Sequence, residues 1–465
     1  MIKRDRLPVA AALCAWILTC AIILLPAIAG AEVIGWRTDG TGRYPDANPP
    51  REWSSEKNVV WKTALPGSSG ASPAVLSDRL FVVSQPAELL CIRTSDGELM
   101  WQRTHTYRDV LGGKEAKKIA DIHARKRALS DQVRQLEQEY RKLARKKPRP
   151  EKRLQDLSNS IAELKTRAGQ IVPTHPAIPR YDPGRDAGNA ASTPVTDGLN
   201  VYSVFGTGIV SSHTIEGKRR WMRFVETPVT DYGHASSPVL VGGKLVVHLV
   251  DLVALDADSG DEIWRVKLPA RHATPIATRI GGVDVLLTAA GAIVSVADGK
   301  TLAKGLFGLH IPSPVVHDGI VYVHQHDKIK AIRLPESPEE TLDPEVLWEV
   351  GSRDAKDVLV SSPVYHEGLL YGVNRSGVFK VIDARTGGLV YRERLSLRAR
   401  IYTSPTLAGG HIHVSANDGA TAILAPGREY KEIARNDLEP FTSTPVFVGK
   451  RMYVRGHQHL YCVGE

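Results

Sequence analysis

The stretch from Ser236 to Trp264 reads SSPVLVGGKLVVHLVDLVALDADSGDEIW, and its pattern decides the fold. It predicts four short strands, at residues 236–240, 244–249, 252–255 and 262–267. Gly242-Gly243 and the Asp256 to Gly260 segment separate them, because tight turns need positive φ or a side chain that bonds its own backbone. Four strands joined by three turns make one blade of a propeller.

A Ser or Thr followed by Pro and an aliphatic residue recurs eight times along the chain. The copies begin at Ser72, Thr193, Ser237, Thr274, Ser313, Ser362, Ser404 and Thr444. Apart from the first interval, successive copies lie 37 to 49 residues apart, which is the length of a four-stranded blade. A sandwich of unrelated hairpins does not predict a fixed period. The last copy runs out one strand short, and Asn58 to Leu65 can supply the missing strand. We therefore predict an all-β fold, an eight-bladed β-propeller closed by its N-terminal strand.

Large aromatic residues recur at one place in the repeat, shortly after the last turn of a blade. They are Trp61, Trp101, Trp221, Trp264, Trp348 and Tyr391. We interpret them as apolar plates between neighbouring blades. Ala303 and Lys431 stand at this place in the fourth and seventh copies, so these two blades are predicted to seal differently.

The first interval contains an insertion, residues 107–172, with a helical pattern. Apolar residues spaced three and four apart predict one helix from Ile119 to Leu143 and a second, shorter one from Leu154 to Ala168. The short basic turn at 146–150 requires the two helices to be antiparallel, so we predict an α-helical coiled-coil hairpin. From Tyr107 to Gln170 there are 18 Lys and Arg against 9 Asp and Glu, which accounts for the whole net charge of +9. Three interpretations remain open: a polyanion ligand, contact with a protein or an envelope surface, or simple decoration.

The N-terminal residues 1–31 have the pattern of an export signal. Three basic side chains precede an apolar run from Leu7 to Ile28, and the run ends in small residues up to Ala31. This pattern predicts a cleaved signal peptide, with an uncleaved membrane anchor as the alternative. The remaining chain divides into residues 32–106 (start of the propeller and first blade), the insertion, and residues 173–465 (blades two to eight).

Candidate binding residues precede the motif on four consecutive blades: Asn189, His234, His272 and His310. The loops that carry them lead into the inner strands. They are expected on the same face as the turns between second and third strands, at the mouth of the central channel. The insertion leaves from such a loop and is expected to rise from that face too. Histidines at a channel mouth suit Zn, Cu or Ni, but no neighbouring carboxylate supports them, so we predict neither a metal nor a catalytic residue.

The repeat from Ser236 to Trp264 resembles that of the pyrroloquinoline quinone (PQQ) propellers. The segments from Gly35-Trp36 to Lys62 and from Tyr232 to Pro238 resemble the BamB-like bacterial envelope branch. That branch implies a cofactor-free propeller that binds envelope or outer-membrane proteins. The quinoprotein dehydrogenases in the same superfamily imply an adjacent disulfide-linked cysteine pair, which this chain lacks. Cys91 and Cys462 occupy small buried positions of the repeat instead.

The function expected from the sequence is that of an exported, non-catalytic binding or scaffold module in the periplasm or cell envelope. The alternatives are a PQQ-dependent oxidoreductase and a metal- or glycan-binding propeller. No cofactor is expected. Nucleic acid is not expected as a partner either, because no aromatic residues are interleaved with the basic run.

Overall fold

A computed structural model describes residues 34–171, 187–228, 232–337, 341–352 and 358–465. All of them belong to one compact unit, Val33–Glu465. The predicted signal peptide or anchor lies outside the described residues. No helix within the described ranges is both long enough and apolar enough to cross a membrane.

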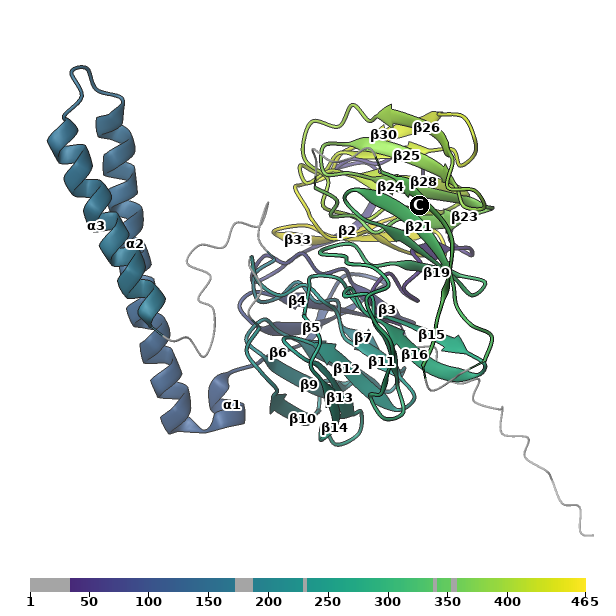
Figure 1. The fold of residues 1–465 in the computed structure, drawn as a ribbon, viewed down its shortest axis with the longest axis horizontal. Coiled ribbons are helices and arrows are strands. Elements are labelled where there is room, and N and C mark those ends of the chain that lie inside the picture. The colour runs from purple at the N-terminus through teal and green to yellow at the C-terminus, as the bar shows by residue number, and fades with distance from the viewer. Residues whose placement is uncertain (1–33, 172–186, 229–231, 338–340, 353–357) are drawn as a thin grey trace, which may run out of the picture. The chain divides into compact units, whose positions relative to one another are not determined.

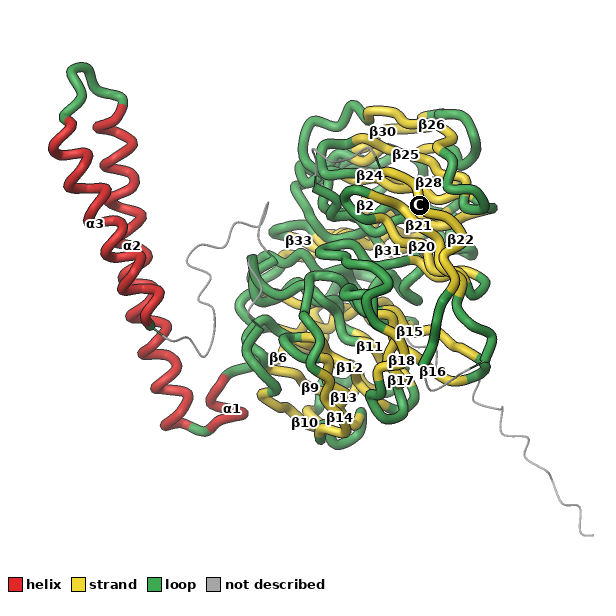
Figure 2. The backbone as a smooth tube through the Cα atoms, viewed as in Figure 1, coloured by secondary structure: helices red, strands yellow, loops and turns green. Residues whose placement is uncertain are grey.

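Eight sheets confirm the predicted eight-bladed propeller. The first blade contains β3 (Ala74–Leu76), β4 (Arg79–Ser84), β5 (Glu88–Arg93) and β6 (Leu99–Thr104), and the second contains β7 (Val195–Thr196), β8 (Asn200–Val204), β9 (Ile209–Thr214) and β10 (Arg219–Phe224). The third contains β11 (Val239–Val241), β12 (Lys244–His248), β13 (Leu252–Asp256) and β14 (Glu262–Val266), and the fourth contains β15 (Ile276–Ile280), β16 (Val283–Leu287), β17 (Ile293–Ser295) and β18 (Thr301–Ala303). The fifth blade contains β19 (Val315–His317), β20 (Ile320–His324), β21 (Lys328–Arg333) and β22 (Glu345–Gly351). The sixth contains β23 (Val364–His366), β24 (Leu369–Val373), β25 (Val378–Asp383) and β26 (Leu389–Arg394), and the seventh contains β27 (Thr406–Ala408), β28 (His411–Ser415), β29 (Thr421–Leu424) and β30 (Glu432–Asn436). Within each of these seven blades the four named strands are antiparallel neighbours in chain order, and the described helices occur only in the insertion (Figure 2).

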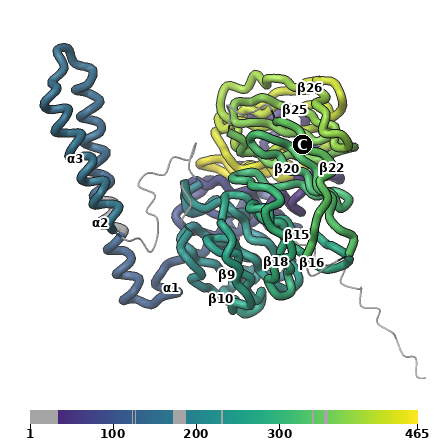
Figure 3. The backbone as a smooth tube through the Cα atoms, in the orientation of Figure 1, coloured from purple at the N-terminus to yellow at the C-terminus, as the bar shows by residue number. Residues whose placement is uncertain are grey.

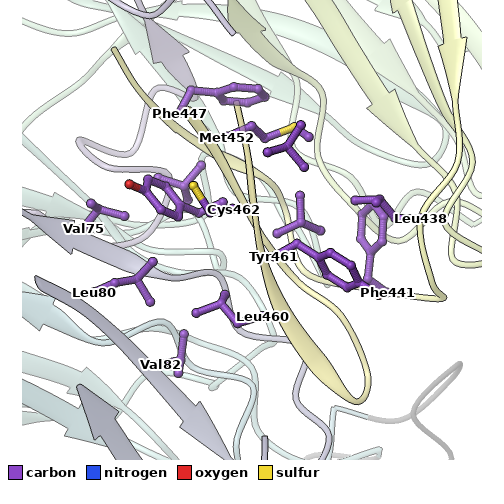
Figure 4. Packing of buried hydrophobic residues seen from close by; sticks show 14 of the residues in the cluster. Val75, Leu80, Val82, Leu438, Phe441, Phe447, Met452, Leu460, Tyr461 and Cys462 are labelled. Atoms are coloured by element: carbon purple, nitrogen blue, oxygen red, sulfur yellow. The ribbon is translucent and has the colours of Figure 1, made fainter. Parts of the chain in front are cut away.

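The eighth blade is closed by the N-terminal strand, as predicted. It contains β31 (Val446–Val448), β32 (Arg451–Arg455) and β33 (His459–Val463), and β2 (Val59–Ala64) pairs antiparallel with β33. Figure 3 shows this purple N-terminal strand beside the yellow C-terminal end. A buried cluster that includes Phe441, Met452 and Tyr461 fills this blade and joins it to the first blade (Figure 4). Closure therefore gives β33 a partner on its outer side and completes the four strands of the eighth blade, so that only the short outer edges typical of a propeller remain.

The hydroxyl groups of the Ser/Thr-Pro motif form a ring of hydrogen bonds. At six junctions the motif's backbone amide donates to the motif hydroxyl of the next blade; for example, the amide of Thr193 donates to Ser237 Oγ over 2.9 Å. At the other two junctions the hydroxyl groups of Ser72 and Ser313 donate to carbonyls of the preceding blade. This explains why every copy has Ser or Thr at this place. The following Pro starts the inner strand, where it can be tolerated without an amide donor.

The tryptophans join neighbouring blades as predicted. At five junctions a Trp Nε1 donates to a carbonyl in the last turn of the following blade over 2.9 to 3.0 Å. A positive-φ glycine of that turn lies against each indole ring. At Gly260, for example, an added Cβ would lie 2.5 Å from the ring of Trp221. These positions need glycine both for the backbone conformation and for the close approach.

The blades without a tryptophan seal differently, as expected. Beside Ala303, the amide of Leu342 donates to the carbonyl of Leu302 over 2.7 Å, and Leu342 packs in the same buried cluster. In the seventh blade, Trp53 from the N-terminal part of the chain packs beside the last strand in place of a tryptophan of the blade itself. The amide of Trp53 donates to Asn436 Oδ1 over 2.8 Å, and its ring stacks on His413.

The insertion forms three helices: α1 (Tyr107–Leu111), α2 (Gly113–Ala144) and α3 (Glu151–Gln170). α2 and α3 run side by side as an antiparallel helical hairpin (Figure 1), and Glu139–Arg153 and Glu137–Lys165 ion pairs link them. Whether their packing is that of a coiled coil stays a prediction. The insertion leaves the ring where β6 ends, on the face of the blade-connecting loops, and Tyr107 Oη there donates to the carbonyl of Thr207 over 2.9 Å. Its first helix, α1, then packs along the outer strand β10. Tyr107 lies edge-on to Phe224, and Asp109 lies 3.5 Å from Arg219.

Candidate functional site

The first described segment, Ile34–Tyr44, lies in the central channel, and we call it the channel segment. Ile34 exchanges two backbone hydrogen bonds with Thr196 at the end of the inner strand β7. β1 (Arg43–Tyr44) pairs parallel with the inner strand β27. Between them, an added Cβ on Gly40 would lie 3.8 Å from Ile276 of the inner strand β15. Because these inner strands belong to the second, fourth and seventh blades, the segment crosses the channel.

Arg37 anchors the channel segment. Its side chain is 1% exposed, and its guanidinium donates to the carbonyls of Pro363 and Pro405, over 2.9 and 2.8 Å. Burial lowers the pKa of Arg37 to about 10, so the group remains charged at neutral pH. Arg37 and Thr38 both have positive φ, 53° and 65°. Because a β-branched residue rarely adopts this conformation, the turn is held by its surroundings.

The channel segment was missed by the sequence interpretation. Its strand β1 has only two residues, and the contacts of Arg37 are with residues more than 300 positions away. No local periodicity marks such a segment. The unusual local signal is the glycine content at Gly35, Gly40 and Gly42, and Gly42 has the guanidinium of Arg37 directly against its backbone.

The loops that connect successive blades form one face of the ring, which we call the loop face. In several blades this loop pairs with the turn between the second and third strands of the same blade, which places the two on one face, as predicted. The amide of Gly206 donates to the carbonyl of Asn189 over 2.7 Å, and that of Asn417 donates to Arg400 over 2.8 Å. The turns between first and second strands, such as Asp318-Gly319, lie at the other ends of the strands and form the opposite face.

The four predicted binding residues all lie in loops of the loop face, but their side chains differ in accessibility. His310 is exposed and His272 half-buried, with their rings edge-on at 5.4 Å between centroids. His234 is 1% exposed, so its ring is buried beneath the loop face. Asn189 is half-buried, with Oδ1 shielded from solvent. Of the four side chains, the structure exposes that of His310, half-buries those of His272 and Asn189, and buries that of His234.

Burial keeps the more deeply placed histidine neutral. Desolvation, with a smaller contribution from nearby His272, lowers the pKa of His234 to about 3. A neutral imidazole can bind a metal, but among the described residues no group of three or more His, Cys, Asp or Glu is placed to hold one. The histidines of the loop face are therefore placed for polar contacts at the surface.

The residues around the channel do not fit a quinone cofactor. Cys91 and Cys462 are free, buried and in different blades, and burial raises the pKa of their thiols to about 12 and about 11. They cannot form the adjacent cysteine pair of the quinoproteins. The channel axis itself is occupied by Arg37 and its neighbours.

The sequence profile of the family described as outer membrane protein assembly factor BamB matches residues 54–130, 181–335 and 340–427. The match covers more than half of the chain. The chain belongs to the BamB family. No protein with a curated description matches it. The BamB-like interpretation of the sequence is therefore confirmed at the level of the family, and the matched ranges begin after the channel segment.

Solved structures show the same fold. BamB from Moraxella catarrhalis aligns with a TM-score of 0.53 and 14% identity, over 87% of this chain and 96% of that one. The computationally designed protein Ika8 aligns with a TM-score of 0.53 and 10% identity, over 88% and 100% of the two chains. A europium-containing methanol dehydrogenase covers 91% of this chain and 90% of its own at 10% identity, but its TM-score of 0.44 supports no inference.

Proposed function

We propose that this BamB-family propeller is a non-catalytic scaffold of the bacterial cell envelope that binds protein partners on its loop face. One observation carries the proposal: the chain's own segment fills the central channel around Arg37. A partner therefore meets the ring at its surface. Membership in a family described by outer-membrane assembly supports an envelope protein as the partner.

The loop face has the chemistry of a polar protein interface. Exposed side chains there include Arg271, His310 and His326, and the backbone of neighbouring loops is tied together, as between His272 and His310. The amide of His272 donates to the carbonyl of His310 over 3.0 Å, which holds the two loops in a fixed relation. Such preorganisation lowers the entropic cost of binding.

Affinity capture with matched histidine variants tests this proposal. The tagged full chain is used to capture cross-linked partners from envelope extract, and the partners are quantified by mass spectrometry. Replacing His272 and His310 by Ala should reduce capture of the main partner at least about tenfold, as expected for central interface residues. The control replaces His317 and His366, half-buried histidines on the opposite face of neighbouring blades.

The control pair should capture the same partners as the parent protein. Equal capture by the His272/His310 variant and the parent, with both folded, would place the partner site elsewhere. Loss of capture in both variants would contradict a site confined to the loop face. Melting temperatures of both variants show whether a loss reflects binding or folding.

A further inference from the structure

The end of the helical hairpin carries a concentration of positive charge. We call Arg141–Arg153 the basic tip, which contains the end of α2, the connecting turn and the start of α3. It has eight Lys and Arg residues and one acidic residue, Glu151. All nine charged side chains are exposed. This segment of 13 residues therefore carries a net charge of +7.

Most of these cations have no ion-pair partner among the described residues. Arg153 pairs with Glu139 over 2.7 Å, and Arg141 lies 3.9 Å from Glu137. Within the described part of the chain, the other six form no ion pair: Lys142, Arg145, Lys146, Lys147, Arg149 and Lys152. Their mutual repulsion is thus left uncompensated.

Helix stability does not explain the placement. Cations at the C-terminal end of α2 interact favourably with the helix dipole, but Lys152 and Arg153 lie in the first turn of α3, where the dipole favours acidic residues. A solvated helix face could carry its charges anywhere along the hairpin. Here they gather at the turn, on both helix ends at once. This arrangement suits an external anion.

We propose that the basic tip binds the anionic headgroups of a phospholipid membrane. The tip contains no Phe, Tyr or Trp, so it lacks the aromatic side chains on which single-stranded nucleic acid stacks. Its turn is exposed through Lys146, Lys147 and Arg149, and a bilayer can meet a protruding turn without a matching shape. The apolar run from Leu7 to Ile28 in the same chain is typical of a protein that is exported or anchored at a membrane.

Vesicle sedimentation tests the proposal with residues 33–465, the compact unit that contains every described residue. The parent protein should bind vesicles of phosphatidylglycerol and phosphatidylethanolamine, and should not bind phosphatidylcholine vesicles. Each Lys or Arg near an anionic surface strengthens binding roughly fivefold. The variant Lys146→Glu, Lys147→Glu, Arg149→Glu should therefore bind at least about 100-fold more weakly.

The matched control is Lys114→Glu, Lys117→Glu, Lys118→Glu, which makes the same charge change on exposed residues at the start of α2. It should keep its affinity within about fivefold of the parent. Equal losses in both variants would show attraction by net charge alone and overturn the proposal. Tighter capture of single-stranded RNA than of vesicles at the same salt would also overturn it, in favour of nucleic acid. This test needs no protein partner, so its outcome is independent of the loop-face proposal.

Discussion

A chain that starts at Gly67 should melt at least about 10 °C below a chain that starts at Ile34. It lacks both the channel segment and β2, so β33 loses its antiparallel partner. It also loses Trp61, which is 8% exposed and donates to the carbonyl of Thr94 in the first blade over 2.9 Å. Loss of a buried Trp costs about 3–5 kcal/mol, and 1 kcal/mol corresponds to about 2–4 °C in a domain of 150–250 residues.

A third chain that starts at Asn58 separates the two contributions. It keeps β2 and the junction of Trp61, but it loses the channel segment and Trp53. We expect its melting temperature to lie between those of the other two chains. Calorimetry at one protein concentration measures all three. If the chain starting at Gly67 has the same melting temperature as the chain starting at Ile34, β2 does not close the ring.

Acid should destabilise the ring between pH 6.5 and pH 4.5, because several histidines are buried in the neutral form. Desolvation is the largest cause in each case. It lowers the pKa of His105 and His413 to about 4, and that of His213 and His234 to about 3. All four side chains are at most 4% exposed.

The free energy of unfolding decreases at acid pH because the unfolded chain takes up protons that the folded protein does not. Below pH 6.5 the unfolded chain protonates these histidines while the folded protein leaves them neutral, so the unfolded state binds more protons and the free energy of unfolding falls. Each histidine then costs about 1.36 kcal/mol per pH unit, or about 2 kcal/mol at pH 5. The carboxylates of Asp197 and Glu439 have lowered pKa values, so their stabilisation is lost only at lower pH.

Calorimetry across this range checks the prediction. We expect the melting temperature to be nearly constant above pH 7 and to fall by at least about 10 °C between pH 7 and pH 5. The variant His413→Gln should have a shallower decline, because one buried titrating group is gone. An unchanged melting temperature from pH 7 to pH 5 would show that these side chains become protonated without unfolding.

The blades were predictable because each carries its own local signals. Pro starts the inner strand, glycine closes the turn, and a Trp such as Trp221 occupies one fixed place against the next blade. The missing strand of the eighth blade could be assigned to Asn58–Leu65 because seven complete copies define what is absent. Because the unit repeats, these long-range contacts could be predicted from the sequence.

The site was less predictable, because it depends on how short segments without periodicity are rotated and packed. Spacing placed His234 in a loop of the loop face, but it could not show that the ring turns inward and is buried. Arg37 looked like one basic residue in a glycine-rich segment. Its role comes from carbonyls of Pro363 and Pro405, two blades at the far end of the chain.

The central claim is that the chain fills its own channel and leaves the loop face for partners. Amide hydrogen exchange of the channel segment tests this claim most directly. The amides of Ile34, Gly35 and Thr38 each donate to a backbone carbonyl over 2.9 to 3.0 Å. We predict that peptides covering residues 34–44 exchange as slowly as the inner strand β27. Exchange as fast as that of the exposed turn at 146–149 would contradict the account, because the channel would then be open.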